Sequence, residues 1–192
     1  MLSQLRPAFV VTIFFTLLTG IIYPLAFTAL AQLAVSSQAN GSLVTRNDVV
    51  IGSAVIGQNF GNDRYFHGRP SAAGDKGYDA SNSSGSNLGP TSQKLIDRVK
   101  ATVAGLRASG AATIPADAAT TSGSGLDPDI SPAFAALQVE RVAKARGVPP
   151  ERIRQILGQQ VQEPLLGVLG EPHVNVLTLN LALDAALASG AG

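Results

Sequence analysis

The sequence has 192 residues, with 14 Lys and Arg, 13 Asp and Glu, and no cysteine. Without cysteine the chain can form neither disulfides nor thiolate metal sites. The formal net charge is +1, and no stripe of basic residues runs along the chain, which excludes the usual electrostatic footprint of a nucleic-acid-binding protein.

The first predicted element is a helix over residues 7–35, a stretch that carries no charged residue. A helix of about 20 apolar residues crosses a bilayer, so this stretch predicts one transmembrane helix. Its threonines can donate to backbone carbonyls within the helix, which makes them tolerable in lipid. Pro24 removes one backbone donor, and we expect a kink near Gly20 and Pro24. Because glycine lets a neighbouring helix approach closely, Gly20 and Pro24 are candidate contacts with a partner.

A cleaved signal peptide is the alternative for this stretch, because Arg6 precedes it and Ala29-Leu30-Ala31 resembles a cleavage site. The apolar part of a signal peptide is about 7–15 residues long. The present run is longer before that site, which favours a retained anchor. Arg6 on the short side favours a cytoplasmic N-terminus. The sequence therefore predicts residues 1–6 in the cytoplasm, residues 7–35 in the membrane and residues 36–192 in one extracytoplasmic domain.

Two contrasting stretches open this domain. Residues 49–57 are rich in Val and Ile and predict one or two short strands with a turn or bulge at Gly52. Residues 59–90 are dominated by Gly, Ser, Asn, Asp and Pro, a composition typical of a loop. A loop this long is uncommon in a compact domain and is often a binding surface. A disordered linker is the alternative, but aromatic and Asn-Leu-Gly-Pro patches favour an ordered contact loop.

Residues 91–108 predict a helix, because Thr91 or Ser92 can cap its start and Gly110 can end it. Leu, Ile and Val recur on one face of this helix at intervals of three and four residues. That pattern is typical of ordinary core packing.

A second helix is predicted to begin at Ser131, with Pro132 in its first turn, and to end at Gly147. These residue types suit those positions because Ser accepts from the first free N–H groups and glycine adopts the left-handed backbone that often follows a helix. On the helix surface, Glu140 and Lys144 are expected to form an i,i+4 ion pair.

Three more elements complete the domain. They are a shorter helix over residues 149–159, a strand over residues 174–179 and a terminal helix capped by Asn180. Strands near both ends with helices between them predict an α/β or α+β fold. The predicted fold class is thus an α/β (α+β) extracytoplasmic domain with one N-terminal transmembrane helix.

No catalytic or metal-binding constellation is predicted. Residues 52–57 have the spacing of a phosphate-binding loop but lack the Lys and Ser or Thr that must follow. Residues 127–138 begin like a calcium loop, yet proline replaces its required glycine and glutamine its final glutamate. The Ser-Gly-Ser-Gly run at residues 122–125 is interpreted as a turn, with an anion-binding nest as the alternative. His67 and His173 are far apart in the sequence, and structural roles are expected for both.

A resemblance rests on several short blocks that occur in one order. The blocks are Tyr23-Pro24, residues 38–43, 56–60, 65–66, 69–71, 86–90 and 122–131, Gln138, and residues 141–143, 146–147 and 174–177. Over nearly its whole length the chain resembles the C subunit of the Kdp potassium-transporting ATPase. That family usually reads Ser-Gly-Gly-Ser-Asn-Leu-Gly-Pro, and Ser84 stands where the first glycine is expected. In a left-handed backbone this serine would cost about 1 kcal/mol.

The resemblance implies an inner-membrane complex with a channel-like potassium-translocating subunit, a P-type ATPase subunit and a small accessory membrane peptide. In that complex the C subunit is an accessory chain that does not hydrolyse ATP and has no cofactor of its own. It is often described as a catalytic chaperone that raises the ATP affinity. An extracytoplasmic domain faces away from cytoplasmic ATP, so nucleotide contact within the complex stays open. A role in assembly or at the potassium entrance fits this topology better.

The loop of residues 59–90 and the turn of residues 122–131 are expected to contact these partners, because their composition suits a core poorly. The candidate contact residues are Gly20, Pro24, Tyr65, Phe66, Arg69, Asn87, Leu88, Asp127, Gln138 and Arg141. Alanine at Arg69 or Asn87 is expected to weaken recovery of the complex and to leave thermal unfolding nearly unchanged. The alternative function is an independent membrane-anchored or secreted ligand-binding domain that needs no membrane partner.

Overall fold

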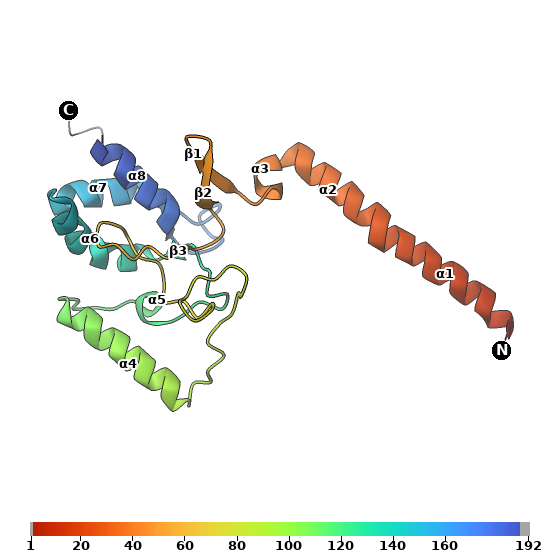
Figure 1. Ribbon diagram of the computed structural model, residues 1–192, viewed down its shortest axis with the longest axis horizontal. Coiled ribbons are helices and arrows are strands. Elements are labelled where there is room, and N and C mark those ends of the chain that lie inside the picture. The colour runs from red at the N-terminus through yellow and green to blue at the C-terminus, as the bar shows by residue number, and fades with distance from the viewer. Residues whose placement is uncertain (1, 189–192) are drawn as a thin grey trace. The chain divides into compact units, whose positions relative to one another are not determined.

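The computed structural model describes residues 2–188, and its chain divides into two compact units between Ile51 and Gly52 (Figure 1). The first unit consists of η1 (Leu2–Gln4), α1 (Leu5–Leu17), η2 (Leu18–Ile22), α2 (Tyr23–Ala34), α3 (Ser36–Ala39) and β1 (Leu43–Arg46). Strand β2 (Val49–Ser53) pairs with β1 in a two-stranded sheet and leads into the second unit.

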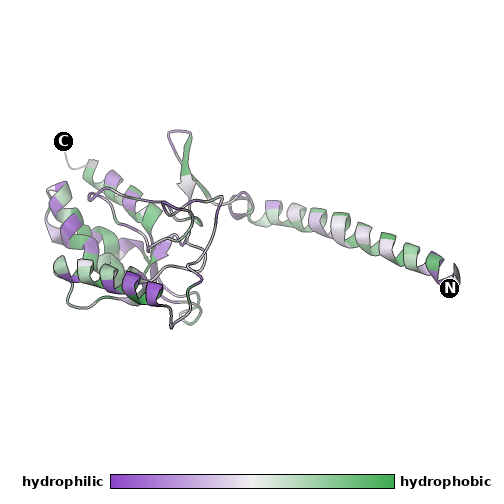
Figure 2. Ribbon diagram, turned by 60° about the horizontal axis from the view of Figure 1, so that its bottom comes forward, coloured by the Kyte–Doolittle hydropathy of each residue, from purple (hydrophilic) through white to green (hydrophobic). Residues whose placement is uncertain are grey.

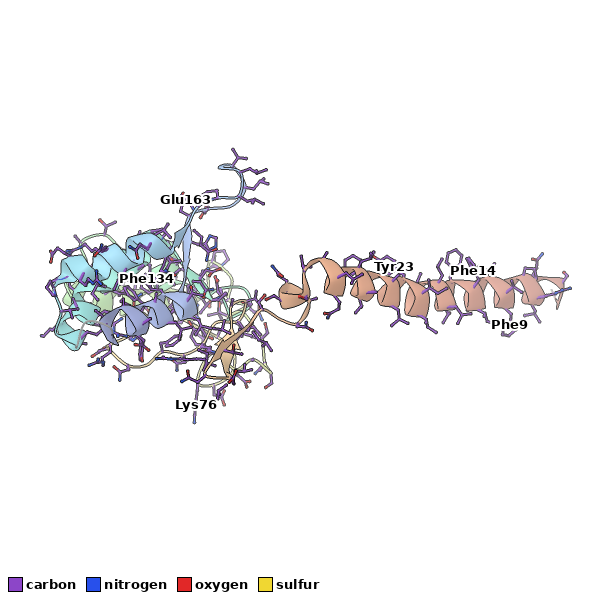
Figure 3. All side chains as sticks on the ribbon, turned by 90° about the horizontal axis from the view of Figure 1, so that it is seen from above. Phe9, Phe14, Tyr23, Lys76, Phe134 and Glu163 are labelled. Atoms are coloured by element: carbon purple, nitrogen blue, oxygen red, sulfur yellow. The ribbon has the colours of Figure 1, made fainter. Side chains whose placement is uncertain are left out.

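The long helix of the first unit is continuous from Leu5 to Ala34 and has the length and composition of a membrane span. Its apolar stretch contains no buried residue. It is green or pale over most of its length in Figure 2. In Figure 3 the side chains of Phe9, Phe14 and Tyr23 project from it. The structure therefore agrees with the predicted single apolar helix at the N-terminus.

Near Gly20 and Pro24, where a kink is expected, the helix contains a π turn. Residues Leu18–Ile22 are π-helical, and the N–H of Tyr23 donates to the carbonyl of Leu18, five residues back. In a regular α-helix the ring of Pro24 would clash with the carbonyl of Gly20, and a π turn widens the helix at that level. Thr19 donates to the carbonyl of Phe15 at 2.6 Å, as expected for a threonine in such a helix.

The second unit combines helices with a small sheet. Its elements are α4 (Gln93–Ala108), α5 (Ala116–Ala119), β3 (Asp129–Ile130), α6 (Pro132–Arg146), α7 (Pro150–Gln160), β4 (Val161–Gln162), β5 (His173–Asn175) and α8 (Val176–Ala188). The sheet is antiparallel in the order β3-β5-β4, with Val174 of β5 opposite Ile130 and Val161. The predicted α+β class is confirmed.

The core of this unit lies between α6, α7 and α8, which pack against one another in sequence order (Figure 1). Phe134 of α6 lies among these helices in Figure 3. The largest side chains that are fully buried are Phe66, Val139, Val142, Ile153, Val174, Leu179 and Leu183, together with the polar Asn180. One of them, Phe66, comes from the long loop.

Helix α6 begins and ends where the sequence predicts. The hydroxyl of Ser131 accepts from the N–H of Phe134 at 3.0 Å, and Gly147 has a left-handed backbone with φ of 70°. The predicted surface pair is wrong, because Glu140 is bound by Arg154 of α7 instead of Lys144. Because α7 packs along α6, the guanidinium of Arg154 lies within reach of the Glu140 carboxylate.

The predicted strand over residues 174–179 is also corrected. Strand β5 stops at Asn175, and α8 begins at Val176. The side-chain oxygen of Asn175 accepts from the N–H of Thr178 at 3.2 Å, and the N–H of Val176 donates to the carbonyl of Pro128 at 2.9 Å. Asn175 therefore caps this helix, and Asn180, the predicted cap, is buried in its interior.

Helix α4 differs from its prediction in burial. The helix forms over Gln93–Ala108, but none of its residues is fully buried. It contacts α5, and only Leu106 near its end packs against the core. Its apolar face is therefore half-buried on the surface of the unit and does not form core packing along its whole length.

Candidate functional site

The loop of residues 59–90 forms no helix or strand, yet its backbone is held at definite points. A loop rich in Gly, Ser and Asn has few apolar side chains to bury, so buried backbone groups must find polar partners elsewhere. At Phe66 that partner is the side chain of Asn180 in α8. Its oxygen accepts from the N–H of Phe66 at 2.8 Å, and its nitrogen donates to the carbonyl of Phe66 at 3.0 Å.

The next residue is held in the same way from the neighbouring helix. The oxygen of Gln138 in α6 accepts from the N–H of His67 at 2.8 Å, and its nitrogen donates to the carbonyl of His67 at 3.0 Å. Arg141, one turn further along α6, donates to the same oxygen of Gln138 at 2.8 Å. Each amide side chain thus accepts from one backbone N–H and donates to one backbone carbonyl of the loop, as a neighbouring strand would. Gln138 and Asn180 together are called here the amide clamp.

Two arginines of α6 hold the chain just before the clamp. Arg141 donates to the carbonyls of Asp63 at 2.7 Å and Tyr65 at 3.0 Å, and its burial lowers the pKa of the guanidinium. Arg146, whose side chain is 4% exposed, donates to the carbonyl of Arg64 at 2.6 Å. These contacts fix three successive carbonyls of the loop, so its course is determined by α6.

Arg146 also joins the loop to α8. Its guanidinium lies 2.9 Å from a carboxylate oxygen of Asp184 and 5.0 Å from the centre of the Tyr65 ring. The hydroxyl of Tyr65 donates to the other oxygen of Asp184 at 3.1 Å. A buried guanidinium needs an ionic partner and satisfied N–H groups, and this arrangement supplies both.

The turn of residues 122–131 packs against the second half of the loop. Arg69 forms an ion pair with Asp127 at 2.9 Å, and the hydroxyl of Ser71 donates to the carbonyl of Gly125 at 2.6 Å. The hydroxyl of Tyr78 donates to the carbonyl of Arg69 at 2.6 Å, and burial raises the pKa of this phenol to about 12. The loop and the turn therefore form one surface, with contacts that belong to the fold.

Close backbone approach explains the glycine at position 125 of this junction. Gly125 has a φ of +67°, and a Cβ atom there would lie 2.5 Å from the carbonyl oxygen of Ser84. Left-handed backbone at described non-glycine residues occurs at Ser42, Asn47, Asp48, Tyr78, Asn87 and Leu166. Ser84 is not among them, so the condition under which this serine would be strained is not met, and its N–H donates to the carbonyl of Ser124 at 2.9 Å.

Two cavities adjoin this surface. One, of about 240 Å³, is lined mainly by the loop and includes His67, Arg69 and Lys76. The other, of about 490 Å³, is lined by Arg69 and His173 and by the carboxylates Asp117, Asp127, Asp129 and Glu171.

Three of these carboxylates have structural partners. Asp117 accepts from the N–H and the hydroxyl of Ser131, Asp127 pairs with Arg69, and Asp129 accepts from Asn175 at 2.9 Å. Burial raises the pKa of Asp129. Across residues 2–188 no group of three or more His, Asp or Glu is placed to hold a metal ion.

The structure brings several sequence-predicted residues together in the second unit. Arg69 pairs with Asp127. Arg141 donates to the side-chain oxygen of Gln138 and to the carbonyl of Tyr65. Asn87 is exposed and Leu88 is half-buried. Phe66 has no exposed surface and its side chain fills the core of this unit, and its contact with a partner stays a prediction.

Sequence reasoning missed Arg146, Asp184 and the role of Asn180. Arg146 and Asn180 lie in helices whose local patterns indicate only a helix end and a helix cap. Their long-range partners are more than thirty residues away in the chain, as in the pair of Arg146 with Asp184. Gly20 and Pro24 lie in the long helix of the first unit, and their contact with a partner stays a prediction.

Comparison with known proteins gives one consistent result. The family model described as K+-transporting ATPase, c chain (KdpC) matches residues 5–185. A potassium-transporting ATPase KdpC subunit of Rhodopseudomonas palustris is 58% identical over 198 residues, covering 97% of this chain and 98% of the relative. The corresponding subunit of Caulobacter vibrioides is 60% identical over 187 residues, covering 96% and 94%. These matches confirm the resemblance found in the sequence, and the chain belongs to the KdpC family.

Proposed function

We propose that the chain is the accessory, single-pass membrane subunit of an ATP-driven potassium uptake complex. The observation that carries this proposal is the joint presence of an exposed apolar helix of 30 residues and a family match that begins within that helix and continues to residue 185. A helix of this length crosses the hydrocarbon core with some tilt. A relative is described as a subunit of a potassium-transporting ATPase, which supports the proposal that this chain is a subunit of such a complex.

The proposed orientation has the N-terminus in the cytoplasm and the second unit outside it. Arg6 lies in the first turn of the helix, whereas the first charges beyond its other end are Arg46 and Asp48, which offset each other. Positive charge near one end of a first helix favours the cytoplasm for that end. The membrane proposed is the inner membrane.

The proposed role is to assemble and stabilise the complex. Its partners would be a channel-like potassium-translocating subunit, a P-type ATPase subunit and a small accessory membrane peptide. At Gly20 nothing lies within 4 Å of where a side chain would begin, so a neighbouring helix could approach the backbone there. ATP hydrolysis belongs to another subunit in this proposal, and any effect of the chain on ATP affinity would pass through the complex.

Two experiments on the full-length chain test this proposal. Protease added to intact spheroplasts should digest the second unit, and full protection would contradict the orientation. A mature N-terminus at Gln32 would instead indicate a cleaved signal peptide. Purification of the tagged chain from native membranes in mild detergent should recover subunits of the potassium-transporting ATPase. Recovery of the chain alone would favour an independent ligand-binding protein.

A further inference from the structure

A short loop between β4 and β5 carries an unusual exposed surface. It comprises residues 163–171 and is called here the apolar loop. Its four large apolar side chains are exposed to solvent by 69% at Leu165, 84% at Leu166, 78% at Val168 and 59% at Leu169. Among the described residues after Gly52, the only other large apolar side chains that are exposed are Val55 and Ile56.

The apolar loop has a defined shape. Leu165 and Leu169 exchange two backbone hydrogen bonds, of 2.9 Å and 3.0 Å, and Gly167 donates to the carbonyl of Pro164 at 2.9 Å. In Figure 3 the segment that follows the labelled Glu163 extends away from the body of the second unit. Exposed apolar groups therefore sit on a backbone that is already ordered, which lowers the entropy lost when such a loop is bound.

The backbone at the tip is strained. Leu166 has a φ of 55°, a left-handed conformation that is unfavourable for a bulky residue other than glycine, Asn or Asp. Glycine would remove this strain. Leucine at this position contributes nothing to the core, since its side chain is the most exposed of the four. The strain and the exposure together indicate that the side chain itself has a use outside the domain.

We propose that the apolar loop is a docking element that inserts Leu165, Leu166, Val168 and Leu169 into an apolar pocket on another protein subunit, outside the cytoplasm. This inference rests on the proposed function, since it requires the chain to work in a complex. The pocket would be rimmed by Lys or Arg side chains, which complement Glu163 and Glu171 at the two ends of the loop.

Charge favours a protein over the lipid surface as the occupant. Residues 160–172 contain no Lys, Arg, Trp or Tyr, the residues that hold interfacial segments at anionic and zwitterionic bilayers. The two flanking glutamates carry negative charge, which any anionic lipid at a membrane surface would repel. A second copy of this chain is disfavoured for a similar reason, because a two-fold contact through the loop would bring like charges together.

Recovery of the complex provides the first test. Full-length chains carrying Leu166→Gly with Val168→Ala are compared with wild type and with a Val55→Ala control, each tagged and purified from native membranes in mild detergent. The double variant should recover at least tenfold less of the ATPase subunits per chain, with a thermal unfolding temperature equal to or above that of wild type, because glycine relieves the strain. The control should match wild type.

The outcomes separate the two proposals. If wild type recovers no ATPase subunit, the proposed function fails. If wild type and the double variant recover equal amounts, the proposed function stands and the docking role of the apolar loop is overturned.

Photo-crosslinking identifies the occupant. A photoreactive amino acid at position 166 of the full-length chain, irradiated in native membranes, should form an adduct with a subunit of the ATPase identified by mass spectrometry. The same group at position 55 is the control for accidental proximity. Adducts with lipid alone, adducts only with a second copy of the chain, or no adduct above the control would each overturn the proposal.

Discussion

Asn180 of α8 holds the backbone of Phe66 by two hydrogen bonds, accepting from its N–H at 2.8 Å and donating to its carbonyl at 3.0 Å. Phe66 is 0% exposed and Asn180 is 2% exposed. Neither backbone group could turn to water if the amide were removed. Phe66 is thus one of the residues at which the core holds the loop of residues 59–90.

The first prediction concerns this amide. Asn180→Ala leaves the N–H and the carbonyl of Phe66 buried without partners, and each such group costs about 1–3 kcal/mol. The free energy of unfolding of the full-length chain in detergent should fall by about 2–6 kcal/mol, measured by chemical denaturation. Asn82→Ala, at an exposed position of the same loop, should change it little. Equal effects of the two substitutions would show that the Asn180 contacts add no stability.

A second prediction follows from His67, next to the same contact. Burial lowers the pKa of His67 below its ordinary value of 6.5, and the positive charge of Arg141 lowers it further. The unfolded chain therefore binds this proton more readily than the folded chain, so stability rises with pH in this range. The contribution of neutral His67 is present above pH 6.5 and is lost as the pH falls below it.

This pH dependence can be measured as the unfolding temperature of the full-length chain at about pH 7.5 and about pH 5.5. The wild-type value should drop at the lower pH, and the drop should be smaller in a His67→Gln variant. A His173→Gln variant should keep the wild-type drop. An equal loss in all three proteins would assign the pH dependence to other groups.

The third prediction concerns the buried guanidinium of Arg146. Lysine has no fork of N–H groups, so Arg146→Lys cannot reach both the carbonyl of Arg64 and Asp184, as arginine does. The variant should lose about 1–3 kcal/mol of folding free energy. Arg152→Lys, at an exposed site on α7, should lose almost none. Retention of wild-type stability by Arg146→Lys would mean that a single positive charge suffices at this site.

The fourth prediction revises the expected effect of changes in the loop. Arg69 forms an ion pair with Asp127 that is only partly exposed, so Arg69→Ala should lower stability by about 1.5–3 kcal/mol as well as weaken any partner contact. Asn87 is exposed with a φ of 51°, a backbone that glycine adopts freely. Asn87→Gly should therefore leave the unfolding temperature nearly unchanged.

Asn87→Gly is consequently the cleaner probe of partner contact. Reduced recovery of the complex with unchanged unfolding would support a contact through the Asn87 side chain. Unchanged recovery would remove Asn87 from the set of partner contacts.

Local sequence patterns predicted the elements whose ends depend on nearby residues. Ser131 and Gly147 determine the ends of α6 through contacts within a few residues, and the apolar run determines the long helix. The same reasoning failed after Asn175, where β-branching suggests that the strand continues. There Asn175 bonds the carbonyl of Ala54 and the carboxylate of Asp129, and these distant contacts place the start of α8.

The amide clamp had no signal in the sequence. Gln138 lies on a helix and Asn180 at an expected cap, and nothing in their neighbourhood indicates that each will bind the backbone of a loop residue some seventy or more positions away. The degree of burial of α4 could not be predicted from the sequence either. An apolar stripe shows which face of a helix is apolar, but it does not show whether another element covers that face. Family resemblance supplied the proposed function, which the residues alone did not.

The most direct test of the account is growth at micromolar potassium in a strain that lacks its own copy of this subunit. Three chains are compared: the full-length chain, a chain whose residues 1–35 are replaced by an unrelated transmembrane helix, and a chain whose residues 1–35 are replaced by a cleavable signal peptide. Full-length chain should restore growth, and the secreted domain should fail although it is folded outside the cytoplasm. Growth with the chain that carries the unrelated helix shows whether attachment of the domain to the membrane is enough for potassium uptake. Growth of the strain with the secreted domain at the full-length rate would contradict the claim that this protein acts as a membrane-anchored subunit.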